Sequence, residues 1–97
     1  MKIACAAIKY KTIDDPSTVK YVSGRRHSDC IAQFAEMGLL AKYRVDEESG
    51  FMTDAGDFVD RKTAYEIAER HNQLIAERED RVLYSEFVNL SQYPESL

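Results

Sequence analysis

The chain has 97 residues, of which 44% are hydrophobic and 31% charged, proportions that indicate one small soluble domain. A net charge of −4 argues against general binding to the backbone of DNA or RNA, and no apolar run reaches the roughly 20 residues of a membrane span. The apolar start is too short for a signal peptide and is closed by lysines, so we expect a protein of the cytoplasm.

The first quarter of the chain predicts two antiparallel strands. Residues 2–10 form a nearly continuous run of apolar and β-branched side chains, which is typical of a strand covered on both faces. Residues 12–17 contain Asp, Pro and Ser and predict an exposed loop. Residues 18–23 combine β-branched and aromatic side chains with polar ones and predict the second strand.

A first helix is expected after Gly24. Ser28 or Asp29 can cap its N-terminus, and Gly38 is a natural stop at its other end. The expected inward-facing residues are Cys30, Ile31, Phe34 and Ala35.

The second half of the chain predicts short strands and another helix. A short strand at residues 42–45 and an acidic turn at residues 46–50 are followed by a hairpin around the turn at residues 54–57. Asp60 is the expected N-cap of a helix. The inward-facing residues of that helix are Ala64, Ile67, Ala68 and His71. The predicted fold is therefore α+β, a small antiparallel β-sheet with two main helices, and we expect it to be oligomeric because so short a chain has a modest core.

The C-terminal tail, residues 77–97, is charged at first and then amphipathic. A terminal segment with this much apolar content rarely extends freely into water. We therefore expect a single domain, residues 1–97, whose tail packs on the domain or on a neighbouring subunit.

No pattern in the chain predicts a metal or a cofactor. Asp54, Asp57 and Asp60 recur at every third residue but lack the oxygen pattern of a calcium loop, and they are better explained by a turn and a helix cap. Cys5 and Cys30 are not spaced as zinc ligands and are expected to be buried and reduced. Neither a P-loop nor a G-x-G-x-x-G motif is present.

The stretch around Arg25, Arg26 and His27 gathers positive charge where a helix should begin. Helix N-termini favour anions and guanidinium groups suit phosphate, so one reading is a phosphate pocket. The other reading is two surface arginines that pair with carboxylates. Phe51 and Phe58, which we expect to face each other across the hairpin, either stack on a base or belong to the core. His27 has no Ser, Cys or carboxylate in a recognisable catalytic arrangement, so we predict no catalytic residues.

Several short motifs recur in one order along the chain. They read R-H-x-D-C-I, then G-F-x-T, then G-x-F-V-D-R-x-x-A, then Q and finally L-Y-S-E, and they occupy residues 24–31, 50–53, 56–64 with Ala68, 72–73 and 83–86. This set resembles the first-described type of phage anti-Thoeris proteins. The charged run at residues 77–81, which includes Arg78 and Arg81, departs from the pattern of the relatives.

The resemblance implies a sponge rather than an enzyme. Members of that family bind cyclic ADP-ribose isomers made by TIR-domain defence proteins and sequester them intact, which would allow a phage to evade immunity in the cytoplasm of its bacterial host. Some members also take up the cyclic oligonucleotides of CBASS defence, and members form homodimers that assemble into hexamers. The ligand contacts that the resemblance implies are Arg25, Arg26, His27, Asp29, Phe51, Thr53, Asp60 and Arg61.

Two other functions stay open at this point. A small nucleotide hydrolase would use His27 with Asp57 or Asp60 as its acid and base. A phage protein-interaction module would use the apolar tail as its docking surface.

Overall fold

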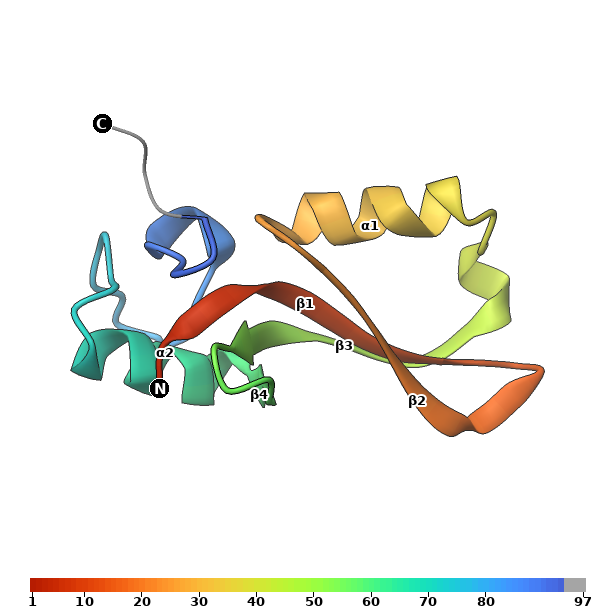
Figure 1. Ribbon diagram of the computed structural model, residues 1–97, viewed down its shortest axis with the longest axis horizontal. Coiled ribbons are helices and arrows are strands. Elements are labelled where there is room, and N and C mark those ends of the chain that lie inside the picture. The colour runs from red at the N-terminus through yellow and green to blue at the C-terminus, as the bar shows by residue number, and fades with distance from the viewer. Residues whose placement is uncertain (94–97) are drawn as a thin grey trace.

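The computed structural model describes residues 1–93 and contains one four-stranded sheet with two main helices (Figure 1). The elements in chain order are β1 (Ile3–Thr12), β2 (Asp15–Gly24), α1 (His27–Glu36), the 3₁₀ helix η1 (Ala41–Tyr43), β3 (Arg44–Thr53), β4 (Phe58–Asp60), α2 (Arg61–Arg70) and the 3₁₀ helix η2 (Ser85–Phe87). All strand pairs are antiparallel, and the strand order is β2-β1-β3-β4. The α+β class with two main helices is thereby confirmed.

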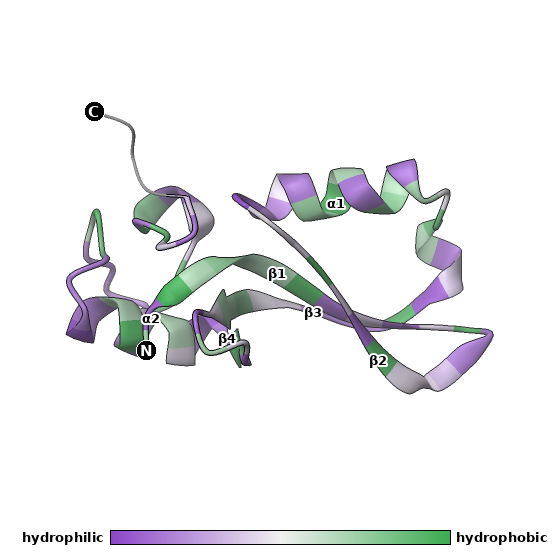
Figure 2. Cartoon of the chain, viewed as in Figure 1, coloured by the Kyte–Doolittle hydropathy of each residue, from purple (hydrophilic) through white to green (hydrophobic). Residues whose placement is uncertain are grey.

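β1 is an inner strand of the sheet and is buried over residues 3–8. Figure 2 colours much of the first part of this strand as hydrophobic. The small side chains Ala4, Ala6 and Ala7 let other groups approach the strand closely on both faces. α1 contacts β2 and β1, whereas α2 contacts β3, β4 and also β1, so the helices cover different parts of the sheet and share the central strand. Their buried side chains meet in one hydrophobic core with Phe51 and the tail residue Leu83.

The first hairpin is tighter than the sequence predicts. Thr12 pairs with Asp15, so the expected loop at residues 12–17 is wrong and only Ile13 and Asp14 connect the two strands. β2 can begin beside Pro16 because it is an edge strand, where a missing N–H breaks no internal ladder.

α1 begins and packs differently from the prediction. Its N-cap is Arg26 rather than Ser28 or Asp29, and the Asp29 carboxylate accepts a hydrogen bond of 3.0 Å from the Arg26 main-chain N–H. The predicted inward stripe is half right, since Cys30 and Phe34 are buried. Ile31, at 59% exposure, and Ala35 are exposed because only a narrow stripe of this helix touches the sheet. The predicted stop is confirmed, because Gly38 follows the helix with a φ of 68°.

β3 is one long strand in place of the short strand and acidic turn expected at residues 42–50. Cross-strand ion pairs explain the difference, since Lys9 Nζ lies 3.1 Å from Glu48 and Lys11 Nζ lies 3.8 Å from Asp46. Asp46 has a φ of 53°, where the β1–β3 register shifts by a bulge.

The second hairpin forms at the predicted turn, where Gly56 has a φ of 90°. The expected pairing of Phe51 with Phe58 is wrong, because Phe51 pairs with Val59 and Met52 pairs with Phe58. Phe51 and Phe58 therefore project from opposite faces of the sheet, since successive strand residues alternate sides. Phe51 is completely buried, and Phe58 lies over Gly50 on the other face.

α2 follows β4 without a loop, and Asp60 caps it as predicted by accepting a 2.8 Å hydrogen bond from the Thr63 N–H. Ala64, Ile67 and Ala68 are buried as predicted. His71 is the C-cap residue, partly buried outside the helix, so its predicted place on the inward helical face is wrong. No helix among the described residues is both long and apolar enough to cross a membrane.

The tail returns to the domain after α2. Leu83, Val88 and Leu90 are buried in the core, and Leu74 forms an isolated bridge with Val88. The main-chain N–H groups of residues 91 and 92 donate to the carbonyl oxygens of Ile3 and residue 4, beside the start of β1. Residues 94–97, the end of the predicted tail, lie outside the described residues.

Candidate anion-binding site

The start of α1 meets the middle of β3 and the tail segment at residues 83–86. The His27 ring connects the first two, because its Nε2 lies 2.8 Å from the Gly50 carbonyl oxygen and the ring packs edge-on against Phe51 at 5.0 Å. The His27 main-chain N–H donates to Ser85 Oγ at 3.4 Å and so connects the helix to the tail. His27 is therefore a junction between three segments that are far apart in sequence.

The His27 ring is expected to be neutral near pH 7. Burial is the main cause that lowers its pKa from the ordinary value of 6.5, and the Arg61 guanidinium lowers it further. The Gly50 hydrogen bond and the Glu86 carboxylate oppose this shift only in part. A neutral ring with its hydrogen on Nε2 donates to the Gly50 carbonyl oxygen.

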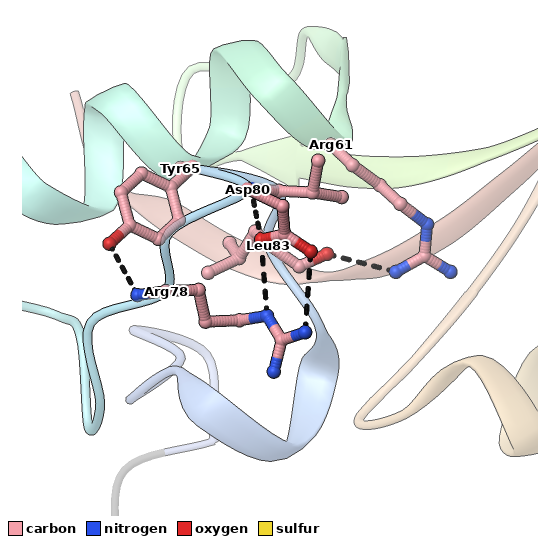
Figure 3. Close-up of polar contacts among 6 residues, drawn as sticks. Arg61, Tyr65, Arg78, Asp80 and Leu83 are labelled. Atoms are coloured by element: carbon pink, nitrogen blue, oxygen red, sulfur yellow. Dashed lines mark hydrogen bonds and ion pairs between the residues drawn. The ribbon is translucent and has the colours of Figure 1, made fainter.

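Arg61, the first residue of α2, is a partly buried guanidinium whose two hydrogen bonds go to neutral oxygens. Its Nε donates to Ser49 Oγ at 3.0 Å, and its terminal Nη1 donates to the Leu83 carbonyl oxygen at 2.9 Å (Figure 3). The Leu83 N–H in turn donates to the Arg61 carbonyl oxygen at 3.0 Å. Arg61 thus holds both main-chain groups of Leu83 and fixes the tail beside β3.

The Arg61 guanidinium has no carboxylate counterion among residues 1–93. Desolvation lowers its pKa, and only the more distant Tyr84 and Glu86 oppose that shift. The ion pairs within residues 1–93 involve the cations Lys9, Lys11, Lys20, Arg44, Arg78 and Arg81. In this part of the chain, neither Arg61 nor the pair Arg25 and Arg26 has a carboxylate oxygen within 4.0 Å. The surface ion-pair interpretation of Arg25 and Arg26 therefore finds no partner among the described residues.

Arg25 and Arg26 line a hollow between the start of α1 and the tail. The hollow is small, with a volume of about 50 Å³, and it opens to solvent. Its remaining lining residues are Ile75, Ser85, Glu86, Val88, Asn89, Leu90 and Tyr93. Cationic, anionic and amide groups therefore share one recess, with an apolar floor from the tail.

Arginine side chains also lie over the aromatic rings of the tail segment. The Arg78 guanidinium lies 4.5 Å from the centre of the Tyr84 ring and 5.3 Å from that of Phe87, and Arg61 lies 5.2 Å from Tyr84. Figure 3 shows how the segment is held, with the Arg78 side chain on Asp80 and the Arg78 N–H donating to the Tyr65 hydroxyl at 2.9 Å. These cation–π contacts help to order the tail segment.

The other predicted contact residues have structural roles. Phe51 is 0% exposed and packs in the core, and Thr53 is buried with its hydroxyl accepting from the N–H groups of the hairpin turn. Asp29 is bonded to the Arg26 N–H at the start of α1, and Asp60 caps α2. The structure thus brings Arg25, Arg26, His27 and Arg61 toward one region and keeps the Phe51 and Thr53 side chains inside the domain.

The tail contributes polar groups that the sequence assigns to no site. Ser85, Glu86 and Asn89 line the hollow beside the arginines. The L-Y-S-E motif marks two of them, and the contacts of Leu83 with Arg61 and of Ser85 with the His27 N–H bring them to the start of α1.

The cysteines and acidic residues form no second site within residues 1–93. Cys5 and Cys30 are free and buried, and burial raises the pKa of the Cys30 thiol to about 11, which keeps it protonated near neutral pH. No group of three or more His, Cys, Asp or Glu side chains in this range is arranged to hold a metal ion.

Comparison with known proteins identifies a family. The chain matches no curated protein and no solved structure. The family model described as phage T4 y16D protein matches residues 2–88, which is most of the chain. The protein therefore belongs to the phage T4 y16D protein family.

Proposed function

We propose that this phage protein binds a small phosphate-bearing nucleotide and sequesters it without converting it. The observation that carries the proposal is the partly buried Arg61 guanidinium, which has two neutral acceptors and no carboxylate within 4.0 Å among the described residues. A guanidinium has five N–H donors, so several remain for an anion. A cation that is desolvated without a counterion gains most when a phosphate arrives.

Arg25 and Arg26 add two exposed cationic side chains that line the hollow beside the tail segment that Arg61 fixes. They stand at the N-terminus of α1, where the helix dipole also favours negative charge. The rest of the chain is acidic, with a net charge of −4. This contrast favours a compact anion over an extended polyanion such as a nucleic acid.

Binding without turnover is the chemistry that suits His27. Its Nε2 is turned to the Gly50 carbonyl oxygen, and its depressed pKa makes it a poor proton donor near neutral pH. Asp60 of the hydrolase alternative is bonded to the N–H of Thr63, where it caps α2. With these contacts, His27 and Asp60 do not act as an acid–base pair in the proposed pocket.

The identity of the ligand comes from the resemblance to anti-Thoeris sponges and from the phage family. We infer a cyclic ADP-ribose isomer made by a TIR-domain protein, with the cyclic oligonucleotides of CBASS defence as a related ligand class. We also infer that the protein is a homodimer that assembles into a hexamer, and that it acts in the cytoplasm of the infected bacterium.

Calorimetry with a cyclic ADP-ribose isomer tests the proposal. Replacing both Arg25 and Arg26 by Ala should weaken binding about tenfold or more for each lost charged hydrogen bond, because such bonds contribute roughly 1.5–3 kcal/mol. Arg61→Lys keeps the charge but loses the fork of donors, so it should also weaken binding. Arg70→Ala, an exposed change at the end of α2, is the matched control and should leave affinity unchanged.

Two results would count against the proposal. Absence of measurable binding to wild-type protein would refute it. Conversion of the ligand under excess substrate, abolished by His27→Ala, would favour the hydrolase instead.

A further inference from the structure

Glu86 is a carboxylate placed within the electropositive region just described. It lines the hollow together with Arg25, Arg26 and Asn89. It is also near enough to His27 and Arg61 to act on the charge of both. Yet within residues 1–93 it forms no ion pair, because the acidic partners of the ion pairs are Asp15, Asp46, Glu47, Glu48, Glu69 and Asp80.

The Glu86 carboxylate is exposed where it lines the hollow, and its neighbour Ser85 is buried. The Ser85 hydroxyl donates to Glu86 Oε1 at 3.3 Å and accepts from the His27 N–H at 3.4 Å. Ser85 and Glu86 both belong to η2. This element comes two residues after Leu83, whose carbonyl oxygen accepts the hydrogen bond from Arg61. The main-chain and hydroxyl contacts therefore hold the carboxylate next to the arginines without neutralising it.

A free carboxylate in this position changes which anions fit. It repels a plain anion such as inorganic phosphate or pyrophosphate that the same arginines hold, because like charges oppose each other, although solvent screens part of this repulsion since Glu86, Arg25 and Arg26 are exposed. The same carboxylate has only acceptor atoms, so it attracts a ligand that presents hydroxyl donors there. Two adjacent carboxylate oxygens match two neighbouring hydroxyls of a ribose-type sugar, and a carboxylate serves dinucleotide folds in the same way.

We propose that Glu86 is a specificity-determining residue that accepts hydrogen bonds from sugar hydroxyls while the neighbouring arginines hold the phosphate of the same ligand. The hollow then selects phosphate esters of a hydroxyl-bearing sugar and rejects simple phosphates. This inference rests on the proposed function, because it names the part of the ligand that faces Glu86.

Calorimetry of wild-type protein and Glu86→Gln with three probes tests the inference. The probes are a cyclic ADP-ribose isomer, ADP-ribose and inorganic pyrophosphate. Glu86→Gln should weaken both sugar-bearing probes about tenfold, as expected for loss of a charged hydrogen bond, and should strengthen pyrophosphate severalfold. Glu66→Gln, an exposed change on α2, is the control that alters net charge equally and should change none of the three affinities by more than about twofold.

A second arm tests the ligand side with unaltered protein. A deoxy analogue of ADP-ribose that lacks a ring hydroxyl should bind wild-type protein about tenfold more weakly than ADP-ribose. This arm does not depend on the stability of any variant.

The outcomes separate this inference from the proposed function. If wild-type protein binds none of the sugar-bearing probes, the proposed function fails and the inference fails with it. If wild-type protein binds them but Glu86→Gln leaves the preference over pyrophosphate unchanged, or weakens all probes equally, Glu86 does not set specificity while the proposed function stands.

Discussion

Gln73 joins the start of β1 to the tail that lines the hollow. Its side-chain oxygen accepts from the Ile3 N–H at 2.8 Å, and its amide nitrogen donates to the carbonyl oxygens of Ile3 at 2.8 Å and Asn89 at 2.9 Å. Gln73 itself is buried. We therefore expect Gln73→Met, which keeps a similar size but removes all three hydrogen bonds, to destabilise the whole domain.

The magnitude follows from what each partner loses. The Ile3 N–H is fully buried and would have no acceptor, which costs about 1–3 kcal/mol. The Ile3 carbonyl oxygen still accepts from the Ser91 N–H at 3.0 Å, and the exposed Asn89 can bind water, so these losses cost about 0.5–1.5 kcal/mol each at most. Partial compensation by the apolar Met side chain leaves a loss of roughly 2–4 kcal/mol, or a fall in Tm of roughly 10–25 °C for a domain of this size.

Thermal unfolding monitored by circular dichroism measures this loss, with Gln92→Met, an exposed change in the same tail, as the control. Gln73→Glu adds a test of mechanism. Its carboxylate would face two carbonyl oxygens, which raises its folded pKa above that of the unfolded chain, so its stability should increase as the pH falls from 7 toward 5. A Gln73→Met protein that melts within a few degrees of wild type, or a Gln73→Glu protein indifferent to pH, would refute the reasoning.

Three further predictions concern the elements around the site. Gly50→Ala should cost about 1–3 kcal/mol in denaturant unfolding, because its Cβ would collide with the Val59 carbonyl oxygen and lie 2.6 Å from Phe58 Cζ; an unchanged midpoint would contradict the close packing of β4 on β3. The depressed pKa of His27, caused first by burial, means that the unfolded chain binds the proton more readily, so the free energy of unfolding should fall as the pH drops below 6.5. His27→Gln should remove that part of the pH dependence, and an identical pH profile would argue against it. Asp60→Ala should lower the free energy of unfolding by about 0.5–2 kcal/mol through loss of the α2 cap, whereas Asp60→Asn should retain most of it.

Local patterns account for the elements that the sequence predicts well. Asp60 is followed by apolar residues at helical spacing, and each of these features depends only on neighbours along the chain. The turn at residues 54–57 likewise depends on a glycine at positive φ, Gly56.

Long-range pairing accounts for the errors. The acidic stretch at residues 46–50 is typical of a turn when it is considered alone, but lysines of β1 lie opposite Asp46 and Glu48 and make a strand favourable. Ile31 has the spacing of a core residue but is exposed, because Cys30 and Phe34 are the α1 side chains that are buried in the core.

The candidate site also contains residues that local sequence identifies and residues that only tertiary contacts bring there. Arg25, Arg26 and His27 can be identified from sequence because they are adjacent and precede a helix. Glu86 joins them through tertiary contacts, the Arg61 bond to Leu83, 22 positions away in the chain, and the His27 bond to Ser85, 58 positions away. A single sequence carries no local signal of such a contact.

The most direct test of the account is to mix the protein with an equimolar amount of a cyclic ADP-ribose isomer, remove the protein by filtration, and measure the ligand by mass spectrometry before and after heat denaturation of the retained protein. The account predicts that the ligand disappears from the filtrate and is then recovered intact on denaturation. Ligand that stays in the filtrate, or that is recovered as linear ADP-ribose, would contradict sequestration as the function of this protein.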